Sequence, residues 1–413
     1  MNVAIFTVGS NPLPIYVVAK YLLDNNRQDK DKIPIPDLLI FIYSENSKGY
    51  FKTLYSKLKM SERSYKLDKI NLGDKERDRE EVQNEVKFNL EKLLSRKEHV
   101  NSVHLHYTGG TKPMSVFSYA AVEEFGKEHG IKTIYSDLDP EKSLIRVGKE
   151  TYPIEKDLRD CIKLDINEIF DLHNMNISNN GTESYTYQKV DITKFSLKTI
   201  NSLKMKKQPS WKAQINSMKS EIKRKLPLNK FQKGFDEVQK EFGHLMPVQW
   251  NEVVSSFPLF KKFIEFFDGK WLEDYILDTL LCMKEKLKLG EIKKSVIATY
   301  KNRPCEIDVI AMRGYQIHYF TCTTSKNIKI VKGKAFEALY RAEQLGGSHA
   351  RVIVVSLLPS IKDPKQSDHC IENLEKDLAS FEAQIEKRVK LIGRNVLEDP
   401  ALLAKEIEDI FLS

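Results

Sequence analysis

Two short loops rich in glycine and hydroxyl residues carry the features of a phosphate-binding site. The first is TVGSNP at 7–12, and the second is YTGGTKPM at 107–114. Each follows an apolar run and precedes a helical pattern, where unpaired N–H groups of a helix N-terminus attract anions. Glycines let a backbone approach a ligand closely, and Lys112 adds positive charge. These loops predict a polyanionic ligand, and the alternative is a pair of tight strand–helix turns.

Neither loop has the spacing of the common nucleotide-binding motifs. The first loop is not G-x-G-x-x-G, and the second is not G-x-x-x-x-G-K-[ST]. The usual ways of binding dinucleotides or ATP are therefore disfavoured.

A group of carboxylates in the last third of the chain indicates a metal site. Glu306 and Asp308 alternate within the apolar run CEIDVIA and therefore share one face of a strand. Glu273 lies in an amphipathic helical stretch nearby in sequence. Carboxylate oxygens are the ligands that Mg²⁺ prefers, and a buried acid is costly unless it is paired or metal-bound. The alternative is that Glu306 and Asp308 lie on the solvent face of an edge strand.

The first 150 residues alternate strand-like and helical segments, which predicts a Rossmann-like, mostly parallel sheet covered on both faces. In such a sheet ligands bind beyond the carboxyl ends of the strands, and both loops follow strands of this sheet. A closing hairpin is expected at Ser143–Ile154. The expected strands are Asn2–Val8, Asp37–Tyr43, Val100–Tyr107 and Ile131–Ser136, and the expected helices are Leu13–Leu23, Tyr50–Lys59, about Lys75–Lys97 and Pro113–Glu128.

The C-terminal region predicts a helix, a three-strand meander, a second helix and a strand. Between the two α/β regions, the polar stretch His173–Ser184 predicts a loop. The second helix is expected to end at a glycine pair, which favours a C-terminal cap. In order, the C-terminal elements are a helix from about Gly269 to Lys288, strands Ser295–Tyr300, Cys305–Met312 and Gln316–Thr323, a helix Gly333–Gln344 and a strand Arg351–Leu358.

Length and composition limit the protein class. With 413 residues and 47.8 kDa the chain predicts two or three domains, and 41% apolar with 30% charged residues excludes collagen-like and disordered chains. No apolar run reaches membrane-spanning length, and the N-terminus lacks the basic region of a secretory signal. The five cysteines form no C-x-x-C pair, which argues against a disulfide framework and a structural zinc site. A cytoplasmic protein without membrane contact is expected.

The formal charge of +8 is concentrated in one segment. The segment from Lys198 to Lys240 contains twelve Lys and Arg residues and three acidic residues. It therefore carries a formal charge of +9, and the remainder of the chain carries about −1. Such a basic segment is an electrostatic footprint for nucleic acid, and the alternative is a solvated, lysine-rich linker.

The stretch VHLHYTGGTKPMS together with the N-terminal TVGSNPLP resembles CARF domains, the cyclic-oligoadenylate sensors of type III CRISPR defence. The resemblance covers about 150 residues. It implies a Rossmann-like homodimer that binds a cyclic oligoadenylate, with cyclic tetra-adenylate the activator expected here. The implied ligand-binding residues are Gly9, Ser10, Asn11, Ser44, Glu45, Thr108, Gly109, Gly110, Thr111, Lys112 and Met114.

The C-terminal order of helical Glu, strand Asp and following strand resembles the PD-(D/E)xK nuclease fold, which is restriction-endonuclease-like. The resemblance implies that Glu273 and Asp308 hold Mg²⁺ or Mn²⁺, with Glu306 as a further catalytic residue. This chain departs from the pattern, because Thr321-Cys322-Thr323 stands where E-x-K is expected. The catalytic lysine is then expected at Lys326, with Lys332 or Lys334 as alternatives.

The whole chain therefore resembles the CARF-linked PD-(D/E)xK nucleases of CRISPR ancillary systems. We expect a CARF sensor domain over 1–155, a basic middle region over 156–250 and a nuclease domain over 251–413. The expected function is cyclic-oligoadenylate-activated, metal-dependent cleavage of DNA or RNA by a homodimer. Two alternatives stay open: a sensor whose degenerate nuclease domain acts as a nucleic-acid-binding regulator, and a ring nuclease that degrades the messenger.

Overall fold

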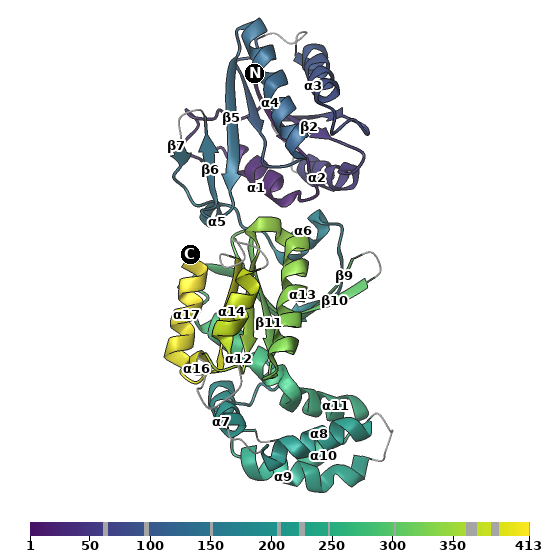
Figure 1. Ribbon diagram of the computed structural model, residues 1–413, viewed down its shortest axis with the longest axis vertical. Coiled ribbons are helices and arrows are strands. Elements are labelled where there is room, and N and C mark those ends of the chain that lie inside the picture. Colours follow the sequence, from purple (N-terminus) through teal and green to yellow (C-terminus); the bar gives the residue numbers. More distant parts are fainter. Residues whose placement is uncertain are drawn as a thin grey trace.

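The protein consists of two α/β domains and a helical module that follow one another along the long axis of the molecule (Figure 1). The second α/β domain lies between the other two parts. The computed structural model describes residues 1–60, 65–94, 99–148, 152–204, 208–222, 228–246, 248–300, 303–360, 370–380 and 388–412.

The first domain is the predicted Rossmann-like domain. Its sheet has the order β3-β2-β1-β4-β5-β6-β7, in which the first five strands are parallel. Alternate residues of β1 face opposite sides of the sheet, so Phe6 packs with α1 and α2, whereas Ile5 packs with α3 and α4. The elements are β1 (Asn2–Thr7), α1 (Leu13–Leu22), β2 (Leu38–Tyr43), α2 (Lys48–Met60), β3 (Lys66–Asn71), α3 (Arg79–Leu94), β4 (Ser102–His106), α4 (Lys112–His129) and β5 (Lys132–Asp139).

The edges of the first sheet differ in how well the sequence predicted them. The closing hairpin is confirmed as β6 (Leu144–Val147) and β7 (Tyr152–Ile154), which pair antiparallel. Strand β3 was not predicted, because its sequence KLDKIN is polar and only Ile70 of it is buried. An edge strand with one buried side chain lacks the apolar pattern that reveals a central strand.

The second domain contains a six-stranded sheet of order β13-β12-β11-β10-β9-β8. The predicted meander is confirmed, since β9 (Leu289–Tyr300), β10 (Arg303–Arg313) and β11 (Gln316–Thr323) pair antiparallel, followed by parallel β12 (Arg351–Ser356) and β13 (Val389–Ile392). Helix α13 (Ile328–Gly346) packs on one face of the sheet, and α12 (Trp271–Cys282) packs on the other with α17 (Pro400–Leu412). The remaining helices of this domain are α14 (Ile371–Ala379) and α16 (Arg394–Leu397).

The expected loop at His173–Ser184 is wrong in part, because Asn176–Thr182 forms the edge strand β8 beside β9. Five of its seven residues are exposed, which explains the polar sequence. Gly181 is required there: its φ is +67°, and a Cβ would lie 2.5 Å from the carbonyl oxygen of Lys294.

The helical module carries most of the basic segment and has an aromatic core. Trp211, Phe195, Phe242 and Phe267 pack together with ring centroids 4.8–6.0 Å apart. No helix among the described ranges combines the length and the apolar character needed to cross a bilayer. The module comprises α7 (Ile192–Lys204), α8 (Ser210–Ile222), α9 (Gln232–Phe242), α10 (Trp250–Val253) and α11 (Phe257–Glu265), while α5 (Leu158–Cys161) and α6 (Ile166–Leu172) lie at the junction of the two α/β domains.

Candidate functional site

The two loops of the first domain lie in direct contact, as expected from their positions after β1 and β4. The Thr7 hydroxyl donates a hydrogen bond to the carbonyl oxygen of Gly109 (2.6 Å). A Cβ on Gly9 would lie only 2.7 Å from the backbone nitrogen of Gly110, so this approach requires glycine. The structure therefore brings Gly9, Gly109 and Gly110 together at the carboxyl ends of adjacent strands.

The threonines of the second loop hold its shape. Thr108 Oγ1 accepts a hydrogen bond from the backbone N–H of Leu138 (2.7 Å). Thr111 is the N-cap of α4, and its hydroxyl accepts from the N–H of Met114 (3.3 Å). Lys112 and Ser10 are exposed. These two side chains therefore remain accessible to a polyanion on the open side of the loops.

Two predicted ligand residues are placed differently from the expectation. The side chains of Met114 and Ser44 are only 1% exposed, and Met114 packs in the core beneath the second loop. A ligand on the open side of the loops does not reach these two side chains in this arrangement, and their role in messenger binding stays a prediction. Glu45 is exposed and forms an ion pair with Lys48 (2.9 Å).

Asn11 lies where the first domain contacts the second. Its Oδ1 accepts a hydrogen bond from the N–H of Leu13 (3.1 Å) and lies 3.1 Å from Nε2 of His173. Its side-chain amide also packs directly against Gly347, the C-terminal cap of α13, where φ is +56°. The first loop is therefore in contact with the second domain through this residue.

The predicted carboxylates converge at one end of the second sheet. Glu273 lies in the first turn of α12 and is 8% exposed, while Asp308 lies on β10. Asp308 Oδ2 accepts hydrogen bonds from the N–H of Cys322 (2.7 Å) and the hydroxyl of Thr321 (3.2 Å) on β11. Burial and the charge of Asp308 raise the pKa of Glu273 to about 8, and burial also raises the pKa of Asp308.

Lys334 lies beside Asp308, one member of this carboxylate pair. Its Nζ donates to the carbonyl oxygen of Cys322 (3.0 Å) and lies 3.8 Å from Asp308 Oδ2. Helix α13 begins at Ile328, five residues earlier than predicted, because the Asn327 side chain caps it by accepting from the N–H of Lys329 (2.9 Å). Lys334 therefore lies in the second turn of the helix and not at its start.

Lys326, the position expected for the catalytic lysine, lies in the contact between the second domain and the helical module. The Nζ of Lys326 donates to the carbonyl oxygen of Leu203 in the helical module. Lys332 forms an ion pair with Asp377 (2.9 Å). Since β11 ends at Thr323 and the chain turns into α13, residue 326 lies beyond the strand that would have aimed it at Asp308.

Glu306 shares the face of Asp308, as predicted, but it is half-exposed and paired. Its Oε1 lies 3.4 Å from Nζ of Lys270, which also donates to the hydroxyl of Ser295 (3.3 Å). Lys270 is the last residue of a short π-helical segment, Phe266–Lys270, that leads into α12. Such segments are frequent at functional sites.

A cavity of about 450 Å³ opens beside these groups, and we call it the catalytic cavity. Glu273 and Asp308 offer buried oxygen ligands whose mutual repulsion a divalent cation would relieve, so the residues present fit Mg²⁺ or Mn²⁺. The cavity is lined by Lys212, Glu265, Asp268, Gly269, Lys270, Glu273, Cys322, Thr323, Thr324, Ser325 and Lys334.

Comparison with known proteins shows the fold of the whole chain. No family model matches the sequence, and no curated protein matches it either. Among solved structures, protein VC1899 from Vibrio cholerae is 14% identical, with a TM-score of 0.67 over 99% of this chain and 98% of that one. Can2 from Sulfobacillus thermosulfidooxidans, solved in complex with cyclic tetra-adenylate, is 14% identical, with a TM-score of 0.63 over 100% of this chain and 99% of that one.

The chain has the fold of Can2. The expected architecture, a Rossmann-like domain joined to a second α/β domain, is thereby confirmed at the level of fold. At this identity the likeness concerns architecture, so the chemistry must be argued from the residues of this chain.

Sequence reasoning missed Lys270 and Lys212 as residues of the catalytic cavity. Lys212 forms an ion pair with Asp268 (3.4 Å), and both side chains line the cavity although 55 residues separate them. Lys270 had one available signal, since it lies three residues before Glu273 and is therefore close to it at the start of α12.

Proposed function

We propose that this protein is a nuclease that cleaves phosphodiester bonds with a divalent metal and is activated by a cyclic oligoadenylate. The observation that carries the proposal is that Glu273 and Lys334 line one cavity at the end of a restriction-endonuclease-like sheet, with Asp308 3.8 Å from the Lys334 Nζ. The same chain holds two contacting glycine loops on a Rossmann-like sheet, as expected for a messenger sensor.

Glu273 and Asp308 would hold the metal. A bound Mg²⁺ or Mn²⁺ would supply Lewis-acid stabilisation of the phosphate and a more acidic water. The hydrogen bonds from the Cys322 N–H and the Thr321 hydroxyl fix the orientation of the Asp308 carboxylate. The second strand carboxylate of the E-x-K pattern is replaced by Thr321, so this chain supports its metal with one acid fewer on β11.

Lys334 takes the role of the missing strand lysine. Its ammonium group, anchored on the Cys322 carbonyl, stabilises the negative charge that develops on the phosphate in the transition state. Lys270 and Lys212, on the same cavity, hold the neighbouring phosphates of the substrate strand. Anchoring by a backbone carbonyl keeps Lys334 in place before substrate arrives, and such preorganisation favours catalysis.

The messenger would bind on the open side of the two loops of the first domain, with Lys112 and Ser10 facing it. Can2 has the same fold and was solved with cyclic tetra-adenylate bound, which supports this class of ligand. We propose that two copies of the chain share one ring, and that ligand binding shifts the population toward a cleavage-competent arrangement.

A cleavage assay tests the proposal. Supercoiled plasmid, single-stranded DNA and single-stranded RNA are incubated with the full chain, in Mg²⁺ and in Mn²⁺, with and without cyclic tetra- or hexa-adenylate. Messenger-dependent cleavage that EDTA stops is the expected result. Nucleic-acid binding without cleavage would indicate a regulator with a degenerate nuclease domain. Degradation of the cyclic oligoadenylate by the protein would indicate a ring nuclease.

A further inference from the structure

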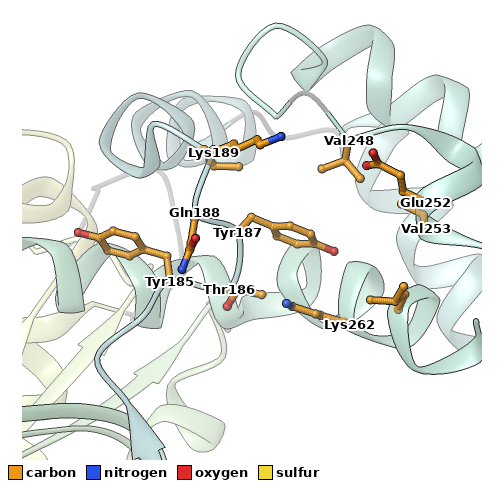
Figure 2. A pocket seen from close by; sticks show the side chains of 11 residues that line it. Tyr185, Thr186, Tyr187, Gln188, Lys189, Val248, Glu252, Val253 and Lys262 are labelled. Carbon is orange, nitrogen blue, oxygen red and sulfur yellow. The ribbon is translucent and has the colours of Figure 1, made fainter.

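A second pocket, of about 430 Å³, opens between the segment 185–190 and helices α10 and α11 (Figure 2). We call it the aromatic pocket. Tyr187 extends from the segment toward Val248 and Glu252, and Lys262 lies below its ring. The Lys262 Nζ is 5.2 Å from the centroid of that ring, within cation–π range. None of the predicted messenger or catalytic residues lines this pocket.

The aromatic pocket is built on the helix that carries Glu273. The N–H of Thr186 donates to Asp274 Oδ2 (2.8 Å), and the hydroxyl of Tyr185 donates to Asp278 Oδ1 (2.7 Å). Lys294 donates to the Thr186 hydroxyl (2.7 Å) and forms a buried ion pair with Asp274. These contacts fix the segment 185–190 against α12, so the pocket keeps a set position relative to the catalytic carboxylates.

The pocket and the catalytic cavity are neighbours along α11. Lys262 lines the aromatic pocket, and Glu265, one helical turn later, lines the catalytic cavity. The edge of the Tyr187 ring packs on Phe266 with ring centroids 5.2 Å apart. Phe266 begins the π-helical segment that ends at Lys270 in the catalytic cavity. The two cavities are therefore lined by residues about one turn apart on α11.

The lining combines the groups that bind a nucleotide of an unpaired strand. The Tyr187 ring and the apolar side chains of Val248 and Leu259 suit the face of a base, while Lys262 and Lys189 suit phosphate. Glu252 is an acceptor for the amino group of a base. A volume of about 430 Å³ lies within the range of small-ligand sites and is compatible with a single nucleotide.

We propose that the aromatic pocket binds one unstacked base of the substrate strand next to the scissile phosphate, and so directs the enzyme to single-stranded or locally unpaired nucleic acid. This inference rests on the proposed function, because it assumes that the catalytic cavity cleaves a strand. Base–aromatic stacking tolerates every base, so the pocket selects strandedness and not sequence.

Binding of short labelled strands to the full chain tests the pocket. Fluorescence anisotropy is measured with fluorescein-labelled oligo(dT), oligo(U) and a duplex of equal length, in EDTA and with saturating cyclic tetra-adenylate. The variants are Tyr187→Ala, Tyr187→Phe and Lys262→Ala. Lys261→Ala is the matched control, since the neighbouring Lys261 is exposed, pairs with Glu265 (3.5 Å) and does not line the pocket.

Tyr187→Ala should weaken single-strand binding by about 10-fold or more, whereas Tyr187→Phe should stay within about 2-fold of wild type. Lys262→Ala should weaken single-strand binding and reduce its salt dependence by about one counterion, and Lys261→Ala should not. Duplex affinity should be the same in all variants. Wild-type single-strand affinity in both Tyr187→Ala and Lys262→Ala, or an equal loss on duplex, overturns the proposal.

Two further observations keep the outcome interpretable. If Tyr187→Ala does not fold, judged by its thermal transition, the comparison of Lys262→Ala with Lys261→Ala decides, because both residues are on the surface of α11. The protein could bind single strands through Tyr187 and yet cleave none of the substrates. That result would contradict the nuclease function but support the pocket as a binding site for an unpaired base. Messenger-dependent cleavage, with unchanged single-strand affinity in Tyr187→Ala and Lys262→Ala, would support the nuclease function and overturn the proposed role of the pocket.

Discussion

The two predicted sites of this protein are assembled in different ways. The messenger loops consist mostly of backbone: Gly9, Gly109 and Gly110 approach closely, and the flanking threonines cap and brace them. The catalytic cavity is lined by side chains from α12, β11 and α13, with two more lysines from α8 and the π-helical segment. A backbone site leaves a contiguous motif in the sequence, whereas a side-chain site leaves scattered residues whose meeting depends on the fold.

The largest expected effect tests the site that is built from side chains. Asp308→Ala should reduce cleavage by roughly 10³-fold or more, because it removes a metal ligand and with it the Lewis-acid contribution. Messenger affinity should not change, since Asp308 lies in the second domain. Plasmid and oligonucleotide cleavage, with calorimetric titration of cyclic tetra-adenylate, measures both.

Metal binding provides a readout of Asp308 that does not depend on activity. Mg²⁺ should raise the melting temperature of the wild type, because it binds the folded state and relieves the repulsion between Glu273 and Asp308. It should not do so in Asp308→Ala. Asp377→Ala, which removes only the exposed partner of Lys332, is the control and should behave as wild type. Near-wild-type cleavage by Asp308→Ala would remove this residue from the site.

The second expected effect sharpens the assignment of the lysine. Lys334→Ala should slow cleavage by about 10²–10³-fold, the scale for one lost transition-state contact, with little change in strand affinity. Lys326→Ala and Lys332→Ala should cleave normally, because their ammonium groups bind the Leu203 carbonyl and Asp377. Single-turnover rates under saturating messenger compare the three. A larger loss in Lys326→Ala than in Lys334→Ala would contradict the assignment.

The third expected effect concerns the backbone-built site. Lys112→Ala should weaken messenger binding by about 1–3 kcal/mol, the scale of a charge-assisted contact with phosphate. The fold should survive, because Lys112 is exposed at the first residue of α4. Cleavage at saturating messenger should be unchanged. Calorimetric titration of cyclic tetra-adenylate measures the affinity, and Lys127→Ala at the other end of α4 is the control; equal affinity in wild type and Lys112→Ala would exclude Lys112.

The same contrast explains how much the sequence could predict. Apolar periodicity revealed the central strands and the meander, because buried strands must be apolar. It could not reveal β3 and β8, whose polar side chains face solvent and whose pairing depends on a neighbouring strand. Glu273 and Asp308 were predictable because a known order of elements carries them. Lys334 was one of three lysines until the early start of α13 was known, and Tyr187 gave no signal because its partners come from distant helices.

The smallest expected effect lies where the two regions meet. His173 is buried between Asn11 of the first loop and the carbonyl oxygen of Ile169, and Asn11 packs on the C-terminal cap of α13, the helix that carries Lys334. This chain of contacts connects the predicted messenger loops to the proposed catalytic lysine. His173→Leu should therefore raise the messenger concentration for half-activation by more than it raises the dissociation constant, with a coupling loss of about 1–2 kcal/mol.

Comparing two measurements on the same variants isolates that coupling. Calorimetry gives the messenger affinity, and a cleavage titration gives the concentration for half-activation. Asn11→Ala changes both the messenger loop and the junction between the domains, so it should raise both the dissociation constant and the concentration for half-activation. His173→Leu changes only the junction, so it should raise the concentration for half-activation by more than the dissociation constant. His173→Gln, which keeps a polar group near Asn11 Oδ1, should lie between His173→Leu and wild type. If affinity and half-activation shift together in His173→Leu, the junction does not transmit the signal, and activation must pass between the domains by another contact, such as the hydrogen bond from Tyr16 to Glu168.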